Sequence, residues 1–219
     1  MIVRPLRDSL RPLKSLTSTP PSFDPSAAPD NPLELFVRWF THAVEAGQVE
    51  PHAMTLSTVD ADGVPDARVL ILKDLTDDGW WFASSSASAK GVELTANPVA
   101  ALTFYWPGVG RSVRVRGTVT RGPEEDNARD FSRRGLGARA VALGSPQSQP
   151  LVSHDESEAA IEEAARELDA HPELVSPTWT LWCVCPESVE FWQSDAERRH
   201  QRLRYSSQGQ SWSTTLLWP

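Results

Sequence analysis

The sequence predicts a mainly β fold, an antiparallel barrel with a few flanking helices. Short strand-like segments separated by turn residues recur between residues 54 and 122, and longer helical segments lie before and after this block. Strands joined in this way are typical of antiparallel barrels. The chain has 219 residues, 40% hydrophobic and 23% charged, the composition of a globular protein. With no internal repeat and no clear boundary, we predict an irregular N-terminal arm at 1–30 and one domain at 31–219.

The N-terminal arm is followed by a predicted helix. Seven of the 18 prolines lie within the first 32 residues, which favours irregular structure. A helix is expected at 32–46, because Asn31 is a good N-cap, Pro32 suits the first helical position and Gly47 is a stop signal. Helical spacing predicts the core-facing side chains Leu33, Phe36, Val37, Phe40 and Val44.

The β block contains five predicted strands, at residues 54–59, 66–73, 80–85, 99–106 and 112–122. The connections are turns at 60–63 and 107–110, a loop at 74–79, and a short helix at 88–97 that ends before Pro98. Alternation places every second side chain of a strand on the same face. The second strand therefore has Arg68, Leu70 and Leu72 on one face, and Val69, Ile71 and Lys73 on the other.

The C-terminal part combines helices and strands. Helices are expected at 123–135 and 156–171, with a long polar loop at 144–154. Strands follow at 179–186 and 188–193, and a hairpin at 202–219. Cys183 and Cys185 share one strand face and are expected to be packed thiols in a reducing, cytoplasmic setting.

Composition and motifs exclude several classes of function. The formal charge of -8 argues against a nucleic-acid partner, because affinity for phosphate backbones comes mainly from Lys and Arg. No apolar run approaches the ~20 residues of a membrane helix, so no membrane partner is expected. Neither a metal-ligand motif nor a Gly-rich nucleotide loop nor a G-x-S-x-G elbow occurs, and we expect no metal. The N-terminal stretch is basic but lacks the pattern of a targeting signal.

One segment of this acidic chain is strongly cationic. Residues 198–204 hold four arginines and one of the five histidines. Such a local cluster suits a small anion, because guanidinium groups donate a fixed fork of charge-assisted hydrogen bonds. Surface ion pairs with Asp195 and Glu197 are the alternative.

Five stretches in order carry a family resemblance: Ala67–Lys73, Trp81–Pro98, Arg111–Gly117, Ser145–Leu151 and Val189–Tyr205. The last is the most specific, with a Glu-Phe-Trp strand followed by an Arg-x-His-x-Arg run from Arg198 to Arg202. Together they resemble the pyridoxamine 5'-phosphate oxidase family of flavin enzymes, from about Asn31 to Pro219. The resemblance implies an FMN-binding split β-barrel and a homodimer with FMN between the subunits. It also implies oxidation of pyridoxine or pyridoxamine 5'-phosphate, with oxygen as acceptor.

The resemblance also implies roles for individual residues. Arg68 and Lys90 are expected at the FMN phosphate, and Arg198 and His200 over the substrate ring as catalytic residues. Lys73 and Arg134 match further substrate positions. The remaining expected cofactor contacts are Val69, Leu70, Ile71, Leu72, Lys73, Ala83, Ser84, Ser112, Gln147, Ser148, Trp192 and Arg202. Taken singly, Arg68 and Lys73 are equally consistent with strand-end charges, Trp192 with the core and Arg202 with a partner of Glu197.

The chain departs from the family pattern at four places. Ala89 replaces an arginine, Ser112 a glutamine, and Ala83 and Ser84 a tyrosine and a threonine. The fourth departure concerns the substrate phosphate, which the family holds with Tyr, Arg and Ser at i, i+4 and i+8 of one helix. Those places are Asp130, Arg134 and Ala138 here. We expect Asp130 to pair with Arg134, and each lost charge-assisted bond to cost ~1.5–3 kcal/mol. Arg133 or Arg139 is a possible substitute donor.

Three other functions remain open. A phenazine-biosynthesis-type flavin oxidase would act on a dihydrophenazine carboxylate, without a phosphate. A non-catalytic protein would bind FMN or pyridoxal phosphate without hydride transfer. A deazaflavin-dependent reductase would prefer the deazaflavin to FMN.

Overall fold

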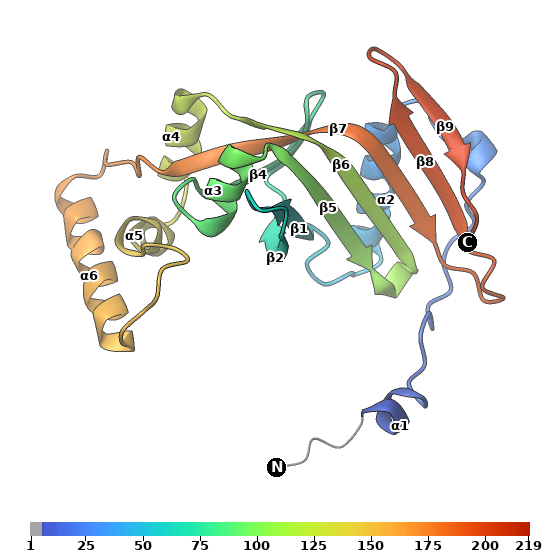
Figure 1. The fold of residues 1–219 in the computed structure, drawn as a ribbon, viewed down its shortest axis with the longest axis horizontal. Coiled ribbons are helices and arrows are strands. Elements are labelled where there is room, and N and C mark those ends of the chain that lie inside the picture. Colours follow the sequence, from blue (N-terminus) through green and yellow to red (C-terminus); the bar gives the residue numbers. More distant parts are fainter. Residues whose placement is uncertain (1–5) are drawn as a thin grey trace.

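A single antiparallel sheet organises the computed structural model, which describes residues 6–219. Its strand order is β2-β1-β5-β6-β7-β4-β3, with β8 paired to β7 and β9 to β8. The sheet curls into half a barrel, with helices around it (Figure 1). The strands are β1 Ala53–Val59, β2 Pro65–Ile71, β3 Asp74–Thr76, β4 Gly79–Ser85, β5 Val99–Trp106, β6 Arg111–Arg121, β7 Trp179–Gln193, β8 Gln201–Ser207 and β9 Trp212–Leu216. The helices are α1 Arg7–Leu10, α2 Pro32–Glu45, α3 Ala89–Ala96, α4 Glu124–Ser132, α5 Leu136–Gly144 and α6 His154–Ala170, with 3-10 turns at Pro25–Ala27 and Pro107–Val109.

The main core lies between the concave face of the sheet and α2. Val113 and Val115 are fully buried there, as the alternation along β6 predicts. Phe36 of α2 packs its ring against Trp80 and Phe104, with centroids 5.3 and 4.9 Å apart. Edge-to-face packing of aromatic rings adds to the stability from burial, so α2 is the element that closes the half-barrel.

The helix α2 begins at the predicted cap but is rotated from the predicted orientation. Asn31 accepts a hydrogen bond from the backbone of Leu33, and Pro32 occupies the first turn. However, Val37 and Val44 are about half exposed, and their predicted core positions are wrong. The fully buried side chains are Leu35, Phe36, Trp39 and Ala43. The large Trp39 takes the central position because it stacks edge-on against Phe191 at 5.2 Å.

Three further elements differ from the prediction. The loop at 74–79 contains the short strand β3, and α5 forms at Leu136–Gly144, where no helix was predicted. The two strands predicted at 179–193 are one continuous strand, β7. Pro186 does not break it because the register between β6 and β7 shifts at Gly117, and Pro is tolerated at such a bulge.

Helices α5 and α6 form a small separate core beside the start of β7. Ala140, Ala164 and Leu168 are buried between them, and Arg139 donates to the carbonyls of Pro172 and Leu174. Figure 1 places this helical pair at one end of the molecule and the β8–β9 hairpin at the other. One end of β7 therefore lies near the helices α5 and α6, and the other end lies near the β8–β9 hairpin (Figure 1).

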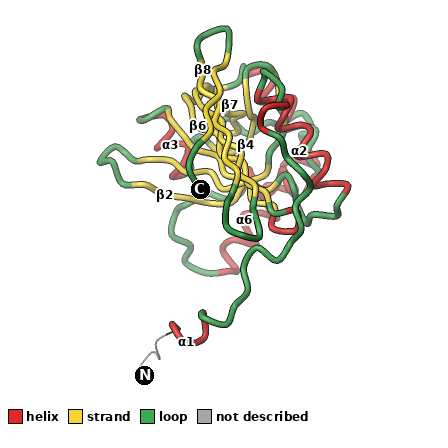
Figure 2. The backbone as a smooth tube through the Cα atoms, turned by 90° about the vertical axis from the view of Figure 1, so that its right-hand side faces the viewer, coloured by secondary structure: helices red, strands yellow, loops and turns green. Residues whose placement is uncertain are grey.

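The second half of the N-terminal arm is fastened to the domain. Gln193 donates to the carbonyl of Pro21 at 2.8 Å, and the Tyr205 hydroxyl donates to Pro29 at 2.7 Å. The beginning of the arm extends away from the domain, with α1 near its end (Figure 2). Residues 1–5 of the predicted arm lie outside the described residues. Among residues 6–219, no helix is long and apolar enough to cross a membrane.

Candidate functional site

Lys90, at the start of α3, forms the centre of a polar cluster. Only 6% of the residue is exposed, and its ammonium donates to Ser88 Oγ and Gln147 Oε1, both at 3.2 Å. The backbone N–H of Ala89 donates to Ser148 Oγ at 3.2 Å. We call Ser88, Ala89, Lys90, Gln147 and Ser148 the Lys90 cluster. The structure thus brings three predicted cofactor residues together: Lys90, Gln147 and Ser148.

The electrostatics of this cluster suit an anion. Burial, followed by the nearby charge of Arg68, lowers the pKa of Lys90 below its usual 10.5. Both hydrogen-bond acceptors of the ammonium are neutral, and the cluster lies at a helix N-terminus, where backbone dipoles favour negative charge. A phosphate would give the buried ammonium a counter-charge. The donor set therefore fits the phosphate of FMN.

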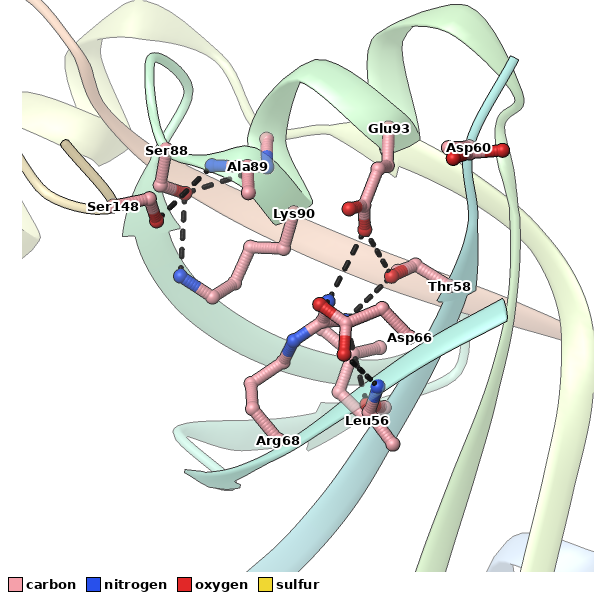
Figure 3. A network of polar contacts seen from close by, with 12 residues as sticks. Leu56, Thr58, Asp60, Asp66, Arg68, Ser88, Ala89, Lys90, Glu93 and Ser148 are labelled. Atoms are coloured by element: carbon pink, nitrogen blue, oxygen red, sulfur yellow. Dashed lines mark hydrogen bonds and ion pairs between the residues drawn. The ribbon is translucent and has the colours of Figure 1, made fainter. Parts of the chain in front are cut away.

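Arg68 lies beside this cluster but is already engaged. Its guanidinium donates to Thr58, Asp66 and Glu93, with 2.7 Å to the Asp66 carboxylate and 3.1 Å to Glu93. Thr58 in turn donates to Glu93. Figure 3 shows Lys90 and Glu93 extending from α3 toward Arg68 on β2. The network holds the Arg68 guanidinium in place. Of the two cations, Arg68 is bonded to carboxylates, whereas Lys90 is bonded only to neutral acceptors.

An apolar cavity of about 240 Å³ adjoins the Lys90 cluster. Gln147 belongs to both, and the predicted cofactor residues Leu70, Ala83 and Ser84 line the cavity wall. Arg134 enters from the helical side, with its guanidinium 4.0 Å from the ring centre of Trp179. Burial lowers the pKa of Arg134, although Asp130 opposes that shift. We call this space the apolar cavity.

Asp130 pairs with Lys73 rather than with Arg134, so that prediction is wrong. Its Oδ1 lies 2.9 Å from the Lys73 ammonium, and its Oδ2 accepts from the Trp179 indole at 2.8 Å. Lys73 and Asp130 line a different cavity of about 460 Å³, together with Asp74, Asp126, Arg129 and Arg133. We call it the polar cavity. Lys73 is thus held by Asp130 in the polar cavity and does not line the apolar cavity that Arg134 lines.

A second group of predicted residues lies on β6, β7 and β8. Ser112, Trp192 and Arg202 line a third cavity, of about 420 Å³, which we call the C-terminal cavity. Arg202 binds Glu190 at 2.7 Å rather than Glu197, so the predicted alternative partner is wrong. Glu197 instead pairs with Arg199. Trp192 is only partly buried, which leaves its ring available at the cavity wall.

The two predicted catalytic residues lie in the loop between β7 and β8, and His200 contacts a residue of the C-terminal cavity, Trp192. His200 Nδ1 accepts from the backbone of Asp195 at 3.1 Å, and its ring centre is 4.9 Å from that of Trp192. Arg198 is exposed and has a φ of 65°, in the left-handed region. Such a conformation is uncommon for a residue other than glycine and is found at functional sites more often than elsewhere.

Within one protomer these residues therefore form two groups. Among the described residues, the apolar cavity is lined by no residue of β6 or β8, and the C-terminal cavity by no residue of the Lys90 cluster. Val69 and Ile71 of β2, two further predicted cofactor residues, are 68% and 40% exposed, and Tyr105 of β5 is 57% exposed. Leu72 packs against the core as a partly buried side chain.

Sequence reasoning missed several residues of this region. Ser88 carried a signal, because a serine directly before a helix is a typical N-cap. Glu190 also carried one, because it belongs to the Glu-Phe-Trp strand of the family resemblance, whereas Glu93 and Trp179 carried none that pointed to this region. Their partners come from distant parts of the chain and are known only from the folded structure.

Comparisons with known proteins found similar sequences over most of the chain. Residues 40–167 match the family described as pyridoxamine 5'-phosphate oxidase, and residues 179–219 match the pyridoxine 5'-phosphate oxidase C-terminal dimerisation region. The pyridoxine/pyridoxamine 5'-phosphate oxidase of Ectopseudomonas mendocina is 42% identical over 194 residues, covering 88% of this chain and 90% of the relative. The protein of the same name from Rubrobacter xylanophilus is 40% identical over 193 residues, covering 88% of each chain.

Two solved structures extend the comparison. PhzG from Burkholderia lata 383, in complex with tetrahydrophenazine-1-carboxylic acid, matches with a TM-score of 0.85 and 29% identity, covering 93% of this chain and all (100%) of that one. A pyridoxamine 5'-phosphate oxidase-related, FMN-binding protein from Nostoc punctiforme matches with a TM-score of 0.70 and 19% identity, covering 88% and 100%. The second likeness concerns the fold alone. Both neighbours share the curled antiparallel sheet with flanking helices.

Proposed function

Because the chain belongs to the pyridoxamine 5'-phosphate oxidase family, we propose that it is an FMN-dependent oxidase of a small reduced ring compound. The observation that carries the proposal is the buried Lys90 ammonium, which has only neutral acceptors at a helix N-terminus. A buried cation without a bonded counter-charge is costly, and an anionic ligand reduces that cost. In this proposal Lys90, Ser88 and Gln147 hold the FMN phosphate, Leu70, Ala83 and Ser84 line the bound cofactor, and the part of the apolar cavity beside Arg134 is left for the substrate.

The complete site is proposed to form between two copies of the chain. The match of residues 179–219 to a dimerisation region supports a homodimer. The exposed apolar side chains of Val69, Ile71 and Tyr105 are suited to burial against a second copy. Each FMN would then receive the Lys90 cluster from one protomer, and Ser112, Trp192 and Arg202 from its partner. Residues 31–219 act as one domain in this arrangement, and the free thiols Cys183 and Cys185 support a cytoplasmic location.

Arg198 and His200 are proposed to act on the substrate. Because His200 Nδ1 accepts from the Asp195 amide, the neutral ring carries its proton on Nε2 and can donate it toward a bound ring. Arg198 adds a permanent positive charge that favours an anionic substrate. FMN, when bound, supplies the hydride acceptor, and oxygen takes the electrons to give hydrogen peroxide. The protein residues orient the reactants and exclude water.

Two substrates are proposed for this reaction. Pyridoxine or pyridoxamine 5'-phosphate is the first, and the names of relatives about 40% identical support it. A dihydrophenazine-type carboxylic acid is the second. It is favoured by the ion pair between Lys73 and Asp130, which removes a cation from the substrate side, and by the ring acid in the PhzG complex.

The proposal is tested by anaerobic reduction of the purified, FMN-loaded protein. Loss of the flavin absorbance band on adding pyridoxamine 5'-phosphate would support the first substrate. Loss only with a reduced phenazine carboxylic acid would support the second. A protein that binds FMN tightly but is reduced by neither compound would refute the oxidase function and favour a non-catalytic binding protein. Preferential binding of the deazaflavin over FMN would refute FMN as the cofactor.

A further inference from the structure

We infer that Asp130 determines the charge of the substrate that the apolar cavity accepts, selecting a flat ring with one carboxylate over a ring with a phosphate dianion. This inference rests on the proposed function, since it concerns the substrate side of that site. It names Asp130 as a specificity-determining residue and a singly charged aromatic or dihydroaromatic acid as the substrate class.

The first step is the position of Lys73. Both oxygens of the Asp130 carboxylate are used, one by the Lys73 ammonium at 2.9 Å and the other by the Trp179 indole at 2.8 Å. The carboxylate is only 18% exposed and the lysine side chain 32% exposed, so water screens this pair less than a surface pair. Lys73 is held in the polar cavity and is neutralised there.

The second step is the charge of the apolar cavity. Among the described residues that line it, Arg134 is the only one with a formal charge. The guanidinium stacks on Trp179, and one terminal nitrogen donates to the carbonyl of Ala138 at 3.2 Å. Its Nε atom is buried and has no hydrogen-bond partner in the part of the chain that the structure describes. One cation with a free donor matches a single negative charge.

The third step concerns the two charges of a phosphate. A dianion beside Arg134 would have one charge balanced and one left over in an apolar space, and the Asp130 carboxylate, bonded to the Trp179 indole, adds negative charge nearby. Unbalanced charge in a poorly hydrated site is strongly disfavoured. A carboxylate avoids this excess, and the walls not assigned to the cofactor, Val141, Ala142 and the Trp179 ring, suit a flat apolar body.

The test compares two ligands that differ only in the phosphate: 4-deoxypyridoxine and its 5'-phosphate. Neither carries an oxidisable group at the reacting carbon, so binding to the FMN-loaded protein is measured without turnover, by calorimetry. In the wild type we expect the phosphate to improve affinity little. In Asp130→Asn, Lys73 is released and the phosphate should improve affinity at least about tenfold more than in the wild type, the effect of one charge-assisted hydrogen bond. The amide still offers an oxygen to the Trp179 indole, and Asp130→Ser provides a second uncharged variant.

Asp126→Asn is the matched control. Asp126 lies one turn earlier on α4, lines the same polar cavity and pairs with Arg129 rather than Lys73. Its removal changes the net charge equally but should alter the phosphate preference by less than about threefold. Equal preferences in Asp130→Asn and the wild type would overturn the inference, as would a wild type that already prefers the phosphate tenfold. Flavin reduction is scored separately, so a protein that no donor reduces would refute the oxidase function while the binding ratio still decides the role of Asp130.

Discussion

Replacing Lys90 by methionine should weaken the recognition of the FMN phosphate without affecting the recognition of the flavin ring. The side chain is 6% exposed, and methionine fills a similar volume without the charge. Removing a charge-assisted bond to a phosphate costs about 1.5–3 kcal/mol, which corresponds to about 10- to 150-fold weaker FMN binding. Riboflavin has the same ring system without the phosphate, so its affinity should change little.

The same substitution should stabilise the protein without cofactor. Burial lowers the pKa of Lys90 in the folded state, so the unfolded chain binds this proton more tightly. The charged lysine therefore destabilises the fold at neutral pH, and this penalty shrinks as the pH rises toward the ordinary value of 10.5. Lys90→Met removes it, and the melting temperature of the apoprotein at pH 7 should increase.

Two assays check this pair of effects. Quenching of flavin fluorescence gives the dissociation constants of FMN and riboflavin, and a thermal melt of the apoprotein gives its stability. The reasoning is refuted if Lys90→Met weakens both flavins equally, because the cluster would then not recognise the phosphate. It is also refuted if FMN binding is unchanged, or if the variant apoprotein melts below the wild type.

Three further predictions concern the fold. Burial raises the pKa of Tyr205 to about 12. Its neutral hydroxyl therefore contributes stability below the unfolded pKa of about 10, and this stability is lost as the pH rises toward 12. The tyrosinate absorbance of the wild type minus that of Tyr205→Phe should titrate with a midpoint near pH 12, and a midpoint near 10 would contradict the burial argument. A Cβ added at Gly117 would lie 1.8 Å from the Cys185 carbonyl oxygen. Gly117→Ala should therefore lower the free energy of unfolding, measured in urea, by about 1–3 kcal/mol or more. Gly135→Ala serves as the control, because a Cβ there meets no atom within 4 Å. Burial raises the pKa of the Cys183 thiol, so an alkylating reagent at pH 8 should modify Cys183 only after unfolding, and its modification in the native protein, seen by peptide mass spectrometry, would argue against this.

The strands were predictable because their side chains alternate. The strand predicted at 99–106 has the same bounds as β5, Val99–Trp106. Buried and more exposed side chains alternate in the second half of this strand, which ends at the Pro-Gly turn. The same local reasoning failed for α2. Val37 and Val44 are apolar but face the solvent. The apolar stripe of α2 is wide enough for two orientations of the helix, and the packing of Trp39 on Phe191 selects the one observed. Local periodicity identifies the helix, whereas its rotation depends on the partner surface.

The proximity of some predicted site residues agrees with the structure, but the pairings of their side chains could not be predicted. Lys90, Gln147 and Ser148 lie together as the family resemblance implies. Asp130, by contrast, was expected to pair with Arg134 four residues later, but α4 ends at Ser132 between them, and Asp130 pairs with a lysine that follows β2 and with a tryptophan on β7. Sequence spacing suggested a local partner for Asp130, whereas in the folded structure its carboxylate is bonded to side chains from distant parts of the chain.

The length of β7 has a consequence for how the activity is distributed between copies. Trp179 and Trp192 lie near opposite ends of this one strand, about 40 Å apart along an extended chain. A strand paired along its length cannot fold back on itself, so a lone protomer cannot bring its two ends to one flavin. Under the proposed arrangement, a copy defective at Lys90 and a copy defective at Trp192 would complement each other. Their mixed dimer would contain one intact site and one site with both defects, so the mixed dimer itself would have half of the activity of a normal dimer.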